Sequence, residues 1–322
     1  MKTEHPHPVP LHCGVFDPTG RWFLAGGRDK SLVCLELESR NKSAIEGHET
    51  WIGAMCRAGE TSVITSDFAG RLIAWATDGA QPKVKWSIEA HSNTILSLAA
   101  SRDGRFVATG DREGRVRVWQ ASDGGRVQEF VASETPAYGV AFNADGKRLF
   151  TADREPKKPR LAAWNWETKE RSWVVEADAL SGYRRVEDIE WGGIRSLAVS
   201  PDGAAVVAGG RNGYDGPASV LVFDAATGEQ KRKLVSTLKN GFYYSMRFHP
   251  DGRLLTAGGD VAKGELRAWK LDADVSLKEL ATAGPCTSVD VHPDGRRVAV
   301  TQMIGKSSYP ESGQIVVFPW DE

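Results

Sequence analysis

One pattern of hydrophobic and polar positions recurs along nearly the whole chain. An alternating apolar run is followed by an Asp-Gly or related turn, a basic residue, a second apolar run that ends in small residues, and a third alternating run that ends in an aromatic residue. Residues 95–119, ILSLAASRDGRFVATGDREGRVRVW, show the pattern most completely. Alternation with period two and enrichment in β-branched and aromatic residues predict strands.

Seven copies of this pattern align on the glycine of the first turn. These glycines are Gly20, Gly59, Gly104, Gly146, Gly203, Gly252 and Gly295. The third runs end near Leu35, Trp75, Trp119, Trp164, Phe223, Trp269 and Phe318. A more polar run such as GRVQEFVA follows the third one and predicts a fourth strand. The copies leave no room for a linker, so we expect a single domain over residues 1–322.

The spacing of the copies predicts the architecture. Asp-Gly between two alternating runs is a strong hairpin signal, because glycine tolerates positive φ and Asp can bond its own backbone in the turn. Four strands in a repeat of roughly 40–45 residues match one blade of a β-propeller. The sequence therefore predicts an all-β fold, a seven-bladed β-propeller with four antiparallel strands per blade.

The repeats resemble those of the WD-repeat (G-beta-type repeat) β-propeller family in a degenerate form. Gly47-His48 and Ala90-His91 stand where the family has Gly-His, and His7 precedes Gly20 by the same distance as His91 precedes Gly104. The resemblance implies that this His joins a buried network with a Ser or Thr, an Asp before the third strand, and the Trp at the end of that strand.

The resemblance places this network in two blades. In the second blade it implies His48, Asp67, either Ser66 or Thr65, and Trp75. In the third blade it implies the residues His91, Thr109 and Trp119, with Glu113 where the family has Asp and with Asp111 two residues earlier. The first blade keeps Asp29 but ends in Leu35, and blades 4 to 7 lack the His.

A closed ring needs a last outer strand, because an open sheet edge invites association. In the WD-repeat family the N-terminal residues usually supply it. We expect residues 1–6 to close the ring through weak pairing, since Pro6 cannot donate to a ladder.

One face of the predicted ring carries all the long insertions. Connections between blades, and those between the second and third strands, share a face, and they include EADALSGYRRVEDIEWGG, RNGYDGPA, MIGKSSYPESG and DREPKKPR. Loops on a rigid ring are where binding is usually built, and aromatic and Arg side chains dominate interface hot spots. The predicted partner-binding residues on this insertion face are Trp51, Tyr138, Tyr183, Arg184, Arg185, Trp191, Tyr214, Phe242, Tyr243 and Tyr309. Alternatively, these residues only cap the blades and the channel mouth.

Composition and charge narrow the function. Lys and Arg number 41 and Asp and Glu 42, which gives a formal net charge of -1. A dedicated nucleic-acid binder normally shows a basic excess. No stretch approaches the roughly 18 apolar residues that a membrane span needs. We therefore expect neither a nucleic-acid nor a membrane partner.

Cysteine and histidine usage predicts a compartment and no metal. Cys13, Cys34, Cys56 and Cys286 show no CxxC spacing and no disulfide framework, and no signal-peptide pattern precedes them. We expect buried thiols and a cytoplasmic location. The early histidines fit no structural zinc spacing, so we expect no metal and no cofactor.

Two functions from different classes remain open. The first is a non-catalytic scaffold, monomeric on its own, that binds an unknown protein or peptide through the insertion face. The second is a propeller enzyme, such as a hydrolase, or a small-ligand or metal-binding protein that acts at the channel mouth and needs convergent polar groups there. The first-strand segments 96–98 (LSL) and 196–198 (SLA) are apolar or small, which favours the scaffold, and no catalytic residue is predicted.

Overall fold

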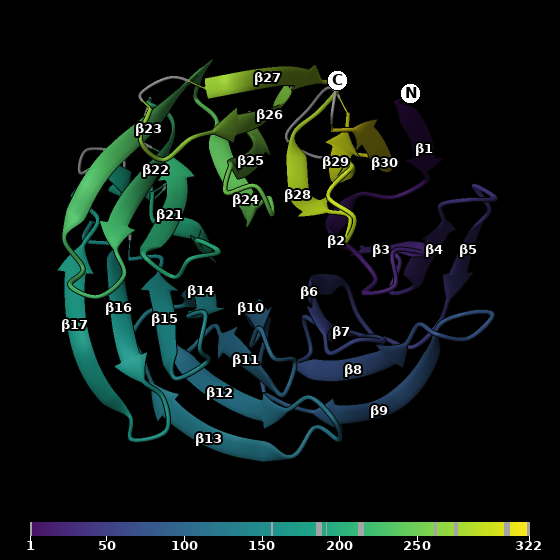
Figure 1. Ribbon diagram of the computed structural model, residues 1–322, viewed down its shortest axis with the longest axis horizontal. Coiled ribbons are helices and arrows are strands. Elements are labelled where there is room, and N and C mark those ends of the chain that lie inside the picture. The colour runs from purple at the N-terminus through teal and green to yellow at the C-terminus, as the bar shows by residue number, and fades with distance from the viewer. Residues whose placement is uncertain are drawn as a thin grey trace.

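Seven four-stranded antiparallel sheets form a ring around a central channel (Figure 1). The computed structural model describes residues 2–155, 157–184, 189–190, 192–211, 216–260, 263–273, 276–305 and 310–320. Each sheet is one blade, and its strands follow one another from the channel outward. The predicted all-β seven-bladed propeller is confirmed.

The first four blades are regular and are built from strands of four to seven residues. Their strands are β2 (Leu11–Phe16), β3 (Trp22–Gly27), β4 (Leu32–Glu36) and β5 (Lys42–Ile45) in blade 1; β6 (Ile52–Ala58), β7 (Ser62–Asp67), β8 (Arg71–Ala76) and β9 (Lys83–Glu89) in blade 2; β10 (Ile95–Ala100), β11 (Phe106–Asp111), β12 (Arg115–Gln120) and β13 (Arg126–Val131) in blade 3; and β14 (Ala137–Phe142), β15 (Arg148–Asp153), β16 (Arg160–Asn165) and β17 (Glu170–Glu176) in blade 4.

Several strands of the last three blades are longer. They are β20 (Ile194–Val199), β21 (Ala205–Arg211), β22 (Pro217–Asp224) and β23 (Gln230–Lys239) in blade 5; β24 (Phe242–Phe248), β25 (Leu254–Gly259), β26 (Gly264–Trp269) and β27 (Ser276–Thr282) in blade 6; and β28 (Cys286–Val291), β29 (Arg297–Ile304), β30 (Ser312–Pro319) and β1 (Thr3–His7) in blade 7. The seven residues at which the third runs were expected to end lie on the third strands, and all seven are buried.

The turns between the first two strands explain the regular spacing of the sequence. All seven turn glycines have positive φ, for example 76° at Gly20 and 72° at Gly104. An L-residue with a side chain rarely adopts this conformation. The Asp of the turn caps it, since Asp103 accepts a hydrogen bond from the Arg105 amide at 3.1 Å. Each Asp-Gly pair thus fixes one hairpin at the end of the channel opposite the insertion face.

The ring closes through the first strand of the chain. β1 pairs antiparallel with β30, so that Thr3 lies opposite Val317 and His7 opposite Gly313. The closing strand expected at residues 1–6 therefore lies at Thr3–His7. Pro6 is accommodated because β1 is an outer strand, where one side of the backbone faces away from the ladder.

Asp290 on β28 adds a second closure at the inner strands. Its carboxylate is fully buried and accepts a hydrogen bond from the Phe16 amide of blade 1 at 2.9 Å. It also forms ion pairs with Arg57 of blade 2 at 3.2 Å and with Arg247 of blade 6 at 2.8 Å. One carboxylate in blade 7 thus connects three other blades.

Every innermost strand carries a β-bulge near its start. The register of the first strand shifts by one residue in each blade. The extra residues are His12, Gly53, Leu96, Tyr138, Arg195, Tyr244 and Thr287. A bulge re-aims a side chain and is often found beside a functional site. Because these strands start at the insertion face, the bulges lie around that mouth of the channel.

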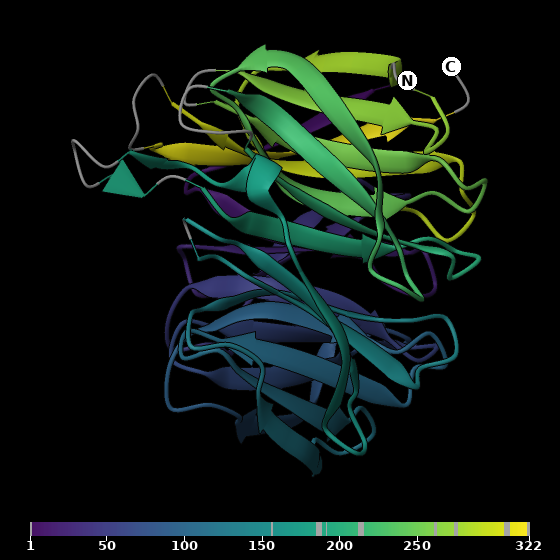
Figure 2. The ribbon, with the colours of Figure 1, turned by 90° about the vertical axis from the view of Figure 1, so that its left-hand side faces the viewer.

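The largest insertion leaves the ring as a small substructure between blades 4 and 5. It contains a 3-10 helix, η1 (Asp178–Leu180), and a two-stranded sheet, β18 (Tyr183–Arg184) and β19 (Ile189–Glu190). In the side view this hairpin projects in teal from the left edge of the disc (Figure 2). Leu180 anchors it by packing into the core cluster shared by blades 4 and 5.

Candidate functional site

The structural network implied in blade 2 is complete. Trp75 Nε1 donates to Thr65 Oγ1 at 2.9 Å, Thr65 Oγ1 lies 2.7 Å from His48 Nε2, and His48 Nδ1 lies 2.9 Å from Asp67 Oδ2. His48 Nδ1–H donates to the Asp67 carboxylate, and the Thr65 hydroxyl also lies within hydrogen-bond distance of the Ile73 carbonyl, at 3.3 Å. Of the two hydroxyl candidates, Thr65 is the member, whereas the Ser66 hydroxyl bonds the Ala54 carbonyl at 3.4 Å.

Blade 3 repeats the network with Asp111 as its acid. Trp119 Nε1 donates to Thr109 at 2.9 Å, His91 Nε2 lies 2.7 Å from Thr109 Oγ1, and His91 Nδ1 lies 2.9 Å from Asp111 Oδ2. The expectation that Glu113 stands at the acid position is wrong. Asp111 ends β11 as Asp67 ends β7, so only Asp111 faces the buried ring, and Glu113 is exposed.

The two acids also hold the turn that follows them. Asp67 Oδ1 accepts hydrogen bonds from the backbone amides of Ala69 and Arg71, both at 3.0 Å. Burial would raise the pKa of Asp67, but the bonds from His48 and from these amides hold it below its usual value. The pKa of Asp111 is lowered for the same reasons. Burial would raise it, but the hydrogen bonds from His91 and from the Arg115 amide lower it further. In each of the two blades, the ionised carboxylate therefore holds the His and the following turn in place.

The other blades keep fragments of this network. In blade 1, His7 Nε2 lies 2.7 Å from Asp29 Oδ2, and no Thr or Trp among the described residues joins them. Trp164 donates to Thr151 at 2.9 Å in blade 4, and Trp269 to Thr256 at 3.0 Å in blade 6.

Ser133 occupies the His position of blade 4. Its backbone amide lies 3.4 Å from the Gly114 carbonyl, as that of His91 bonds Gly70 at 2.9 Å. The smaller side chain bonds Asp153 at 3.0 Å and leaves a cavity of about 300 Å³ beside Asp153 and Trp164.

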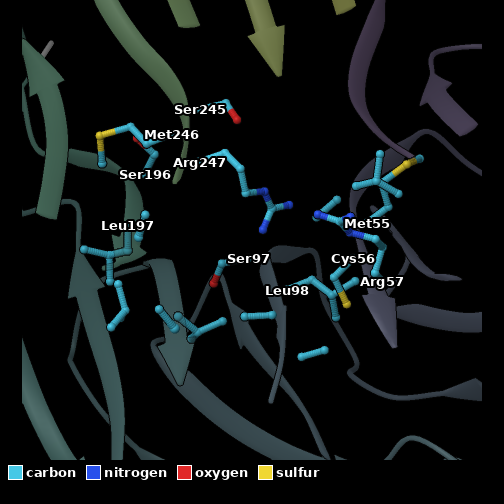
Figure 3. Close-up of a pocket in the computed structure, with 18 of the residues that line it drawn as sticks. Met55, Cys56, Arg57, Ser97, Leu98, Ser196, Leu197, Ser245, Met246 and Arg247 are labelled. Atoms are coloured by element: carbon cyan, nitrogen blue, oxygen red, sulfur yellow. The ribbon is translucent and has the colours of Figure 1, made fainter. Parts of the chain in front are cut away.

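The central channel is a large cavity with few charged groups. Its volume is about 850 Å³, and the first strands of the blades line it. Figure 3 shows Arg57 and Arg247 pointing into it among small and apolar side chains. Both arginines are paired with Asp290, which is itself shielded from the cavity. Among the described residues, no Asp or Glu lines this cavity.

Two groups of arginine and aromatic residues lie at the insertion-face mouth of the channel. The first, called here the aromatic patch, consists of His12, Arg28, Trp51 and Phe68 from blades 1 and 2. The Trp51 and Phe68 ring centroids lie 5.7 Å apart, and the Arg28 guanidinium lies 5.0 Å from the Trp51 ring. Burial, followed by repulsion from Arg28, lowers the pKa of His12 to about 4, so this ring is neutral at physiological pH.

The second group, called here the arginine cluster, lies across blades 4 to 6. Its members are Tyr138, Arg154, Arg195, Arg211, Phe242 and Tyr244. The Arg211 guanidinium lies 5.0 Å from the Phe242 ring, the same arrangement that Arg28 makes with Trp51. Arg28 and Arg211 each follow or end the second strand of one blade, and each aromatic ring lies at the start of the next blade.

The structure places the predicted partner-binding residues in different settings. Trp51 and Tyr138 lie at the mouth with accessible side chains, and Phe242 is buried beneath Arg195 and Arg211. Tyr243 is fully buried, so its side chain offers no surface to a partner. Tyr183 and Arg184 lie on β18. The remaining predicted residues, Arg185, Trp191, Tyr214 and Tyr309, lie outside the described residues.

Sequence reasoning missed most of the functional geometry at the mouth. His12, Arg28, Phe68, Arg154, Arg195, Arg211 and Tyr244 were not among the predicted residues. The sequence does contain a pattern that could have identified Arg28, Arg154 and Arg211. In several repeats an Arg ends or directly follows the second apolar run, as in GGR and ADR.

All four cysteines are free and buried, and burial raises the pKa of the Cys34, Cys56 and Cys286 thiols to about 12. Within the described ranges, no three His, Cys, Asp or Glu side chains gather closely enough to hold a metal ion. In the described residues, no helix is long and apolar enough to cross a membrane.

Comparison with known proteins agrees with the blade networks. The family model of the WD domain, G-beta repeat, matches residues 2–34 and 82–120. The first segment contains His7, and the second contains all four members of the blade 3 network, which are His91, Thr109, Asp111 and Trp119. Together with the seven four-stranded blades, this match supports assignment to the WD-repeat β-propeller family. Its repeats are degenerate, since the His network is complete in blades 2 and 3 and partial in blades 1, 4 and 6.

Several curated WD-repeat relatives are similar to this chain at low identity. The Periodic tryptophan protein 2 homolog of Schizosaccharomyces pombe is 23% identical over 279 residues, which cover 77% of this chain and 32% of that protein. U3 small nucleolar RNA-interacting protein 2 of Homo sapiens is 25% identical over 138 residues, 39% of this chain and 29% of that protein. Topless-related protein 4 of Arabidopsis thaliana is 20% identical over 316 residues, 89% of this chain and 26% of that protein. The chain thus spans about a third or less of the length of these relatives.

Proposed function

We propose that this WD-repeat propeller is a non-catalytic interaction scaffold that binds a protein or peptide through its insertion face. One observation carries the proposal. Among the aromatic side chains whose exposure the structure describes, Trp51, at 38%, and Phe68, at 39%, are the two that are more than about a third exposed, and they contact each other at the channel mouth. Paired exposed aromatics beside an arginine are the composition of an interface hot spot.

The groups in and near the channel favour a scaffold rather than an enzyme that acts at the channel mouth. A hydrolase that works without a metal needs a carboxylate, His or nucleophile with freedom to exchange a proton with the substrate. The Asp290 carboxylate, on an innermost strand, is fully buried and held by Arg57, Arg247 and the Phe16 amide. The Cys56 thiol that lines the cavity is protonated at neutral pH, because burial raises its pKa to about 12.

The proposal includes a cytoplasmic location and a monomeric state. Four free, buried cysteines support the reducing environment of the cytoplasm. We further propose that the ring is monomeric in the absence of a partner, since β1 covers the outer edge of β30.

A double substitution tests the use of the insertion face. Trp51→Ser with Phe68→Ser removes both exposed aromatic rings, and we expect affinity capture of the partner from the native host, read by mass spectrometry, to fall at least about tenfold. The control is Val84→Ser with Val127→Ser, which removes apolar side chains of similar exposure from the outer strands β9 and β13. Equal capture by the aromatic double variant and the wild type, with both folded, would refute the proposal.

A further inference from the structure

Arg195 lies at the centre of the arginine cluster because of the β-bulge on β20. The register shift between Ile194 and Ser196 takes Arg195 out of the ladder. Its guanidinium lies 4.2 Å from the Phe242 ring and 5.7 Å from the Tyr244 ring. The same bulge in blades 4 and 6 places Tyr138 and Tyr244 on either side of it, and both tyrosines line the mouth of the central cavity.

The two neighbouring arginines are held in place by packing and hydrogen bonds. Arg154 donates through Nη1 to the Tyr138 hydroxyl at 3.0 Å and through Nε to the Gly192 carbonyl at 3.3 Å. It packs on Gly193, where an added Cβ would lie 2.5 Å from Arg154 Cγ. Arg211 donates through Nη2 to Asn240 Oδ1 at 3.1 Å. These contacts fix the positions of the two guanidinium groups.

The positive charge of Arg195 is not balanced within the described part of the chain. No carboxylate there forms an ion pair with Arg195, and its Nε is buried without a hydrogen-bond partner. Burial, followed by repulsion from Arg154, lowers the pKa of Arg195 to about 10, and Arg211 adds to the repulsion. Asp260 acts electrostatically on Tyr244 in the same region. Arg154 and Arg195 therefore repel each other, and an incoming anion would relieve this repulsion.

We propose that the arginine cluster binds the carboxylates of an acidic peptide segment, so that the partner of the insertion face presents Asp or Glu side chains to Arg195. This inference rests on the proposed function and adds the chemistry of the partner. The planar guanidinium matches a carboxylate through two parallel N–H···O bonds, and the rings of Phe242 and Tyr244 hold that plane in a fixed orientation.

A peptide fits this site better than a single-stranded nucleic acid. Nucleic-acid binders offer open aromatic faces on which bases stack, together with a basic surface that follows the phosphates. Here the Phe242 face is already covered by Arg195 and Arg211, and the Tyr138 ring by Arg154 at 5.1 Å. The chain as a whole carries a formal net charge of -1. The cluster is thus a local cationic site rather than part of a basic track.

The test measures the binding of two matched peptides to the full chain. The probe is a short fluorescein-labelled peptide that alternates Glu with Gly, and its partner carries Gln in place of Glu. We expect fluorescence anisotropy to show at least about tenfold tighter binding of the Glu peptide at low salt, with the difference shrinking as salt rises. Arg195→Gln should remove the difference, and Arg154→Gln, which changes a more peripheral residue, should reduce it.

Arg112→Gln is the matched control, because Arg112 follows β11 as Arg154 follows β15 but has no aromatic neighbour among the described contacts. It should bind the Glu peptide within about twofold of the wild type. The inference is overturned by equal binding of the two peptides, by no binding of the Glu peptide, or by unchanged binding in a folded Arg195→Gln variant. Tighter, Arg195-dependent binding of labelled oligouridylate would also overturn it. In each case partner capture that still depends on Trp51 and Phe68 would leave the proposed function standing.

Discussion

Asp67→Ala is expected to lower the free energy of unfolding by about 3–5 kcal/mol, because it leaves a buried imidazole and two backbone amides without their acceptor. Asp67 is fully buried, as is the His48 side chain, so water cannot replace the lost bonds without opening the blade. The change also frees the Ala69 and Arg71 amides that shape the turn into β8. Urea denaturation followed by tryptophan fluorescence measures the loss.

A surface Asp of the same blade is the control for this change. Asp78 is exposed in the turn between β8 and β9, and Asp78→Ala should stay within about 0.5 kcal/mol of the wild type. In a double-mutant cycle, Asp67→Ala and His48→Ala should cost far less together than the sum of the single changes, because each removes the same unit. Additive losses would show that the four side chains do not act as a network.

The network also predicts the response to acid. Because the pKa of Asp67 is lowered in the folded protein, the unfolded chain binds more protons in the interval between the two values, and stability rises with pH there. The contribution is complete above the usual Asp value of about 4 and is lost as pH falls through the folded value. Asp67→Ala should therefore flatten the fall in stability below about pH 4 relative to the wild type.

Removal of residues 1–7 is expected to open the ring. The truncated chain loses the ladder between β1 and β30 and the contact of His7 with Asp29. At about 1 kcal/mol for each backbone hydrogen bond, the loss amounts to roughly 3–5 kcal/mol and lowers the thermal midpoint by roughly 10 °C. The bared edge of β30 should also cause concentration-dependent association.

Thermal unfolding and light scattering of two truncated chains measure this effect. Removal of residues 1–2 alone leaves β1 intact and should behave as the wild type. The contacts of Asp290 with three other blades and of His292 Nε2 with the Gly20 carbonyl, at 2.8 Å, still hold blade 7 to blade 1 at the inner strands. We therefore expect an open but folded ring. A monomer with an unchanged midpoint would show that β1 contributes nothing to closure.

The fold could be predicted because each blade repeats the same local chemistry. The Asp-Gly turn, which needs positive φ, and the aromatic anchor at the end of the third strand are both visible as residues at a fixed spacing. The resemblance to the WD-repeat family implied the His, Thr and Trp members in blade 3, and in blade 2 it implied the His and Trp with Ser66 or Thr65 left open. Asp111 was misplaced although its DREG turn has the same length as the DFAG turn after Asp67, and aligning these turns would have identified it.

The arginine cluster could not be predicted because it depends on a shift in register. In the sequence, residues 194–199 (IRSLAV) look like a simple alternating strand in which Arg195 is one solvent-facing residue. The bulge that turns Arg195 toward Phe242 and Tyr244 arises from pairing with β21, which residue types alone do not reveal. The same limit explains Tyr243, whose neighbour Tyr244 takes the bulged position while Tyr243 turns into the core.

Photo-cross-linking from two positions of blade 4 tests most directly whether the insertion face holds the partner. Benzoylphenylalanine replaces Tyr138 at the channel mouth in one variant and Asp145, in the turn on the opposite face, in the other. Irradiation of the captured complex should cross-link the partner from position 138 and not from position 145. Cross-linking from position 145 alone, or equally from both positions, would contradict the account.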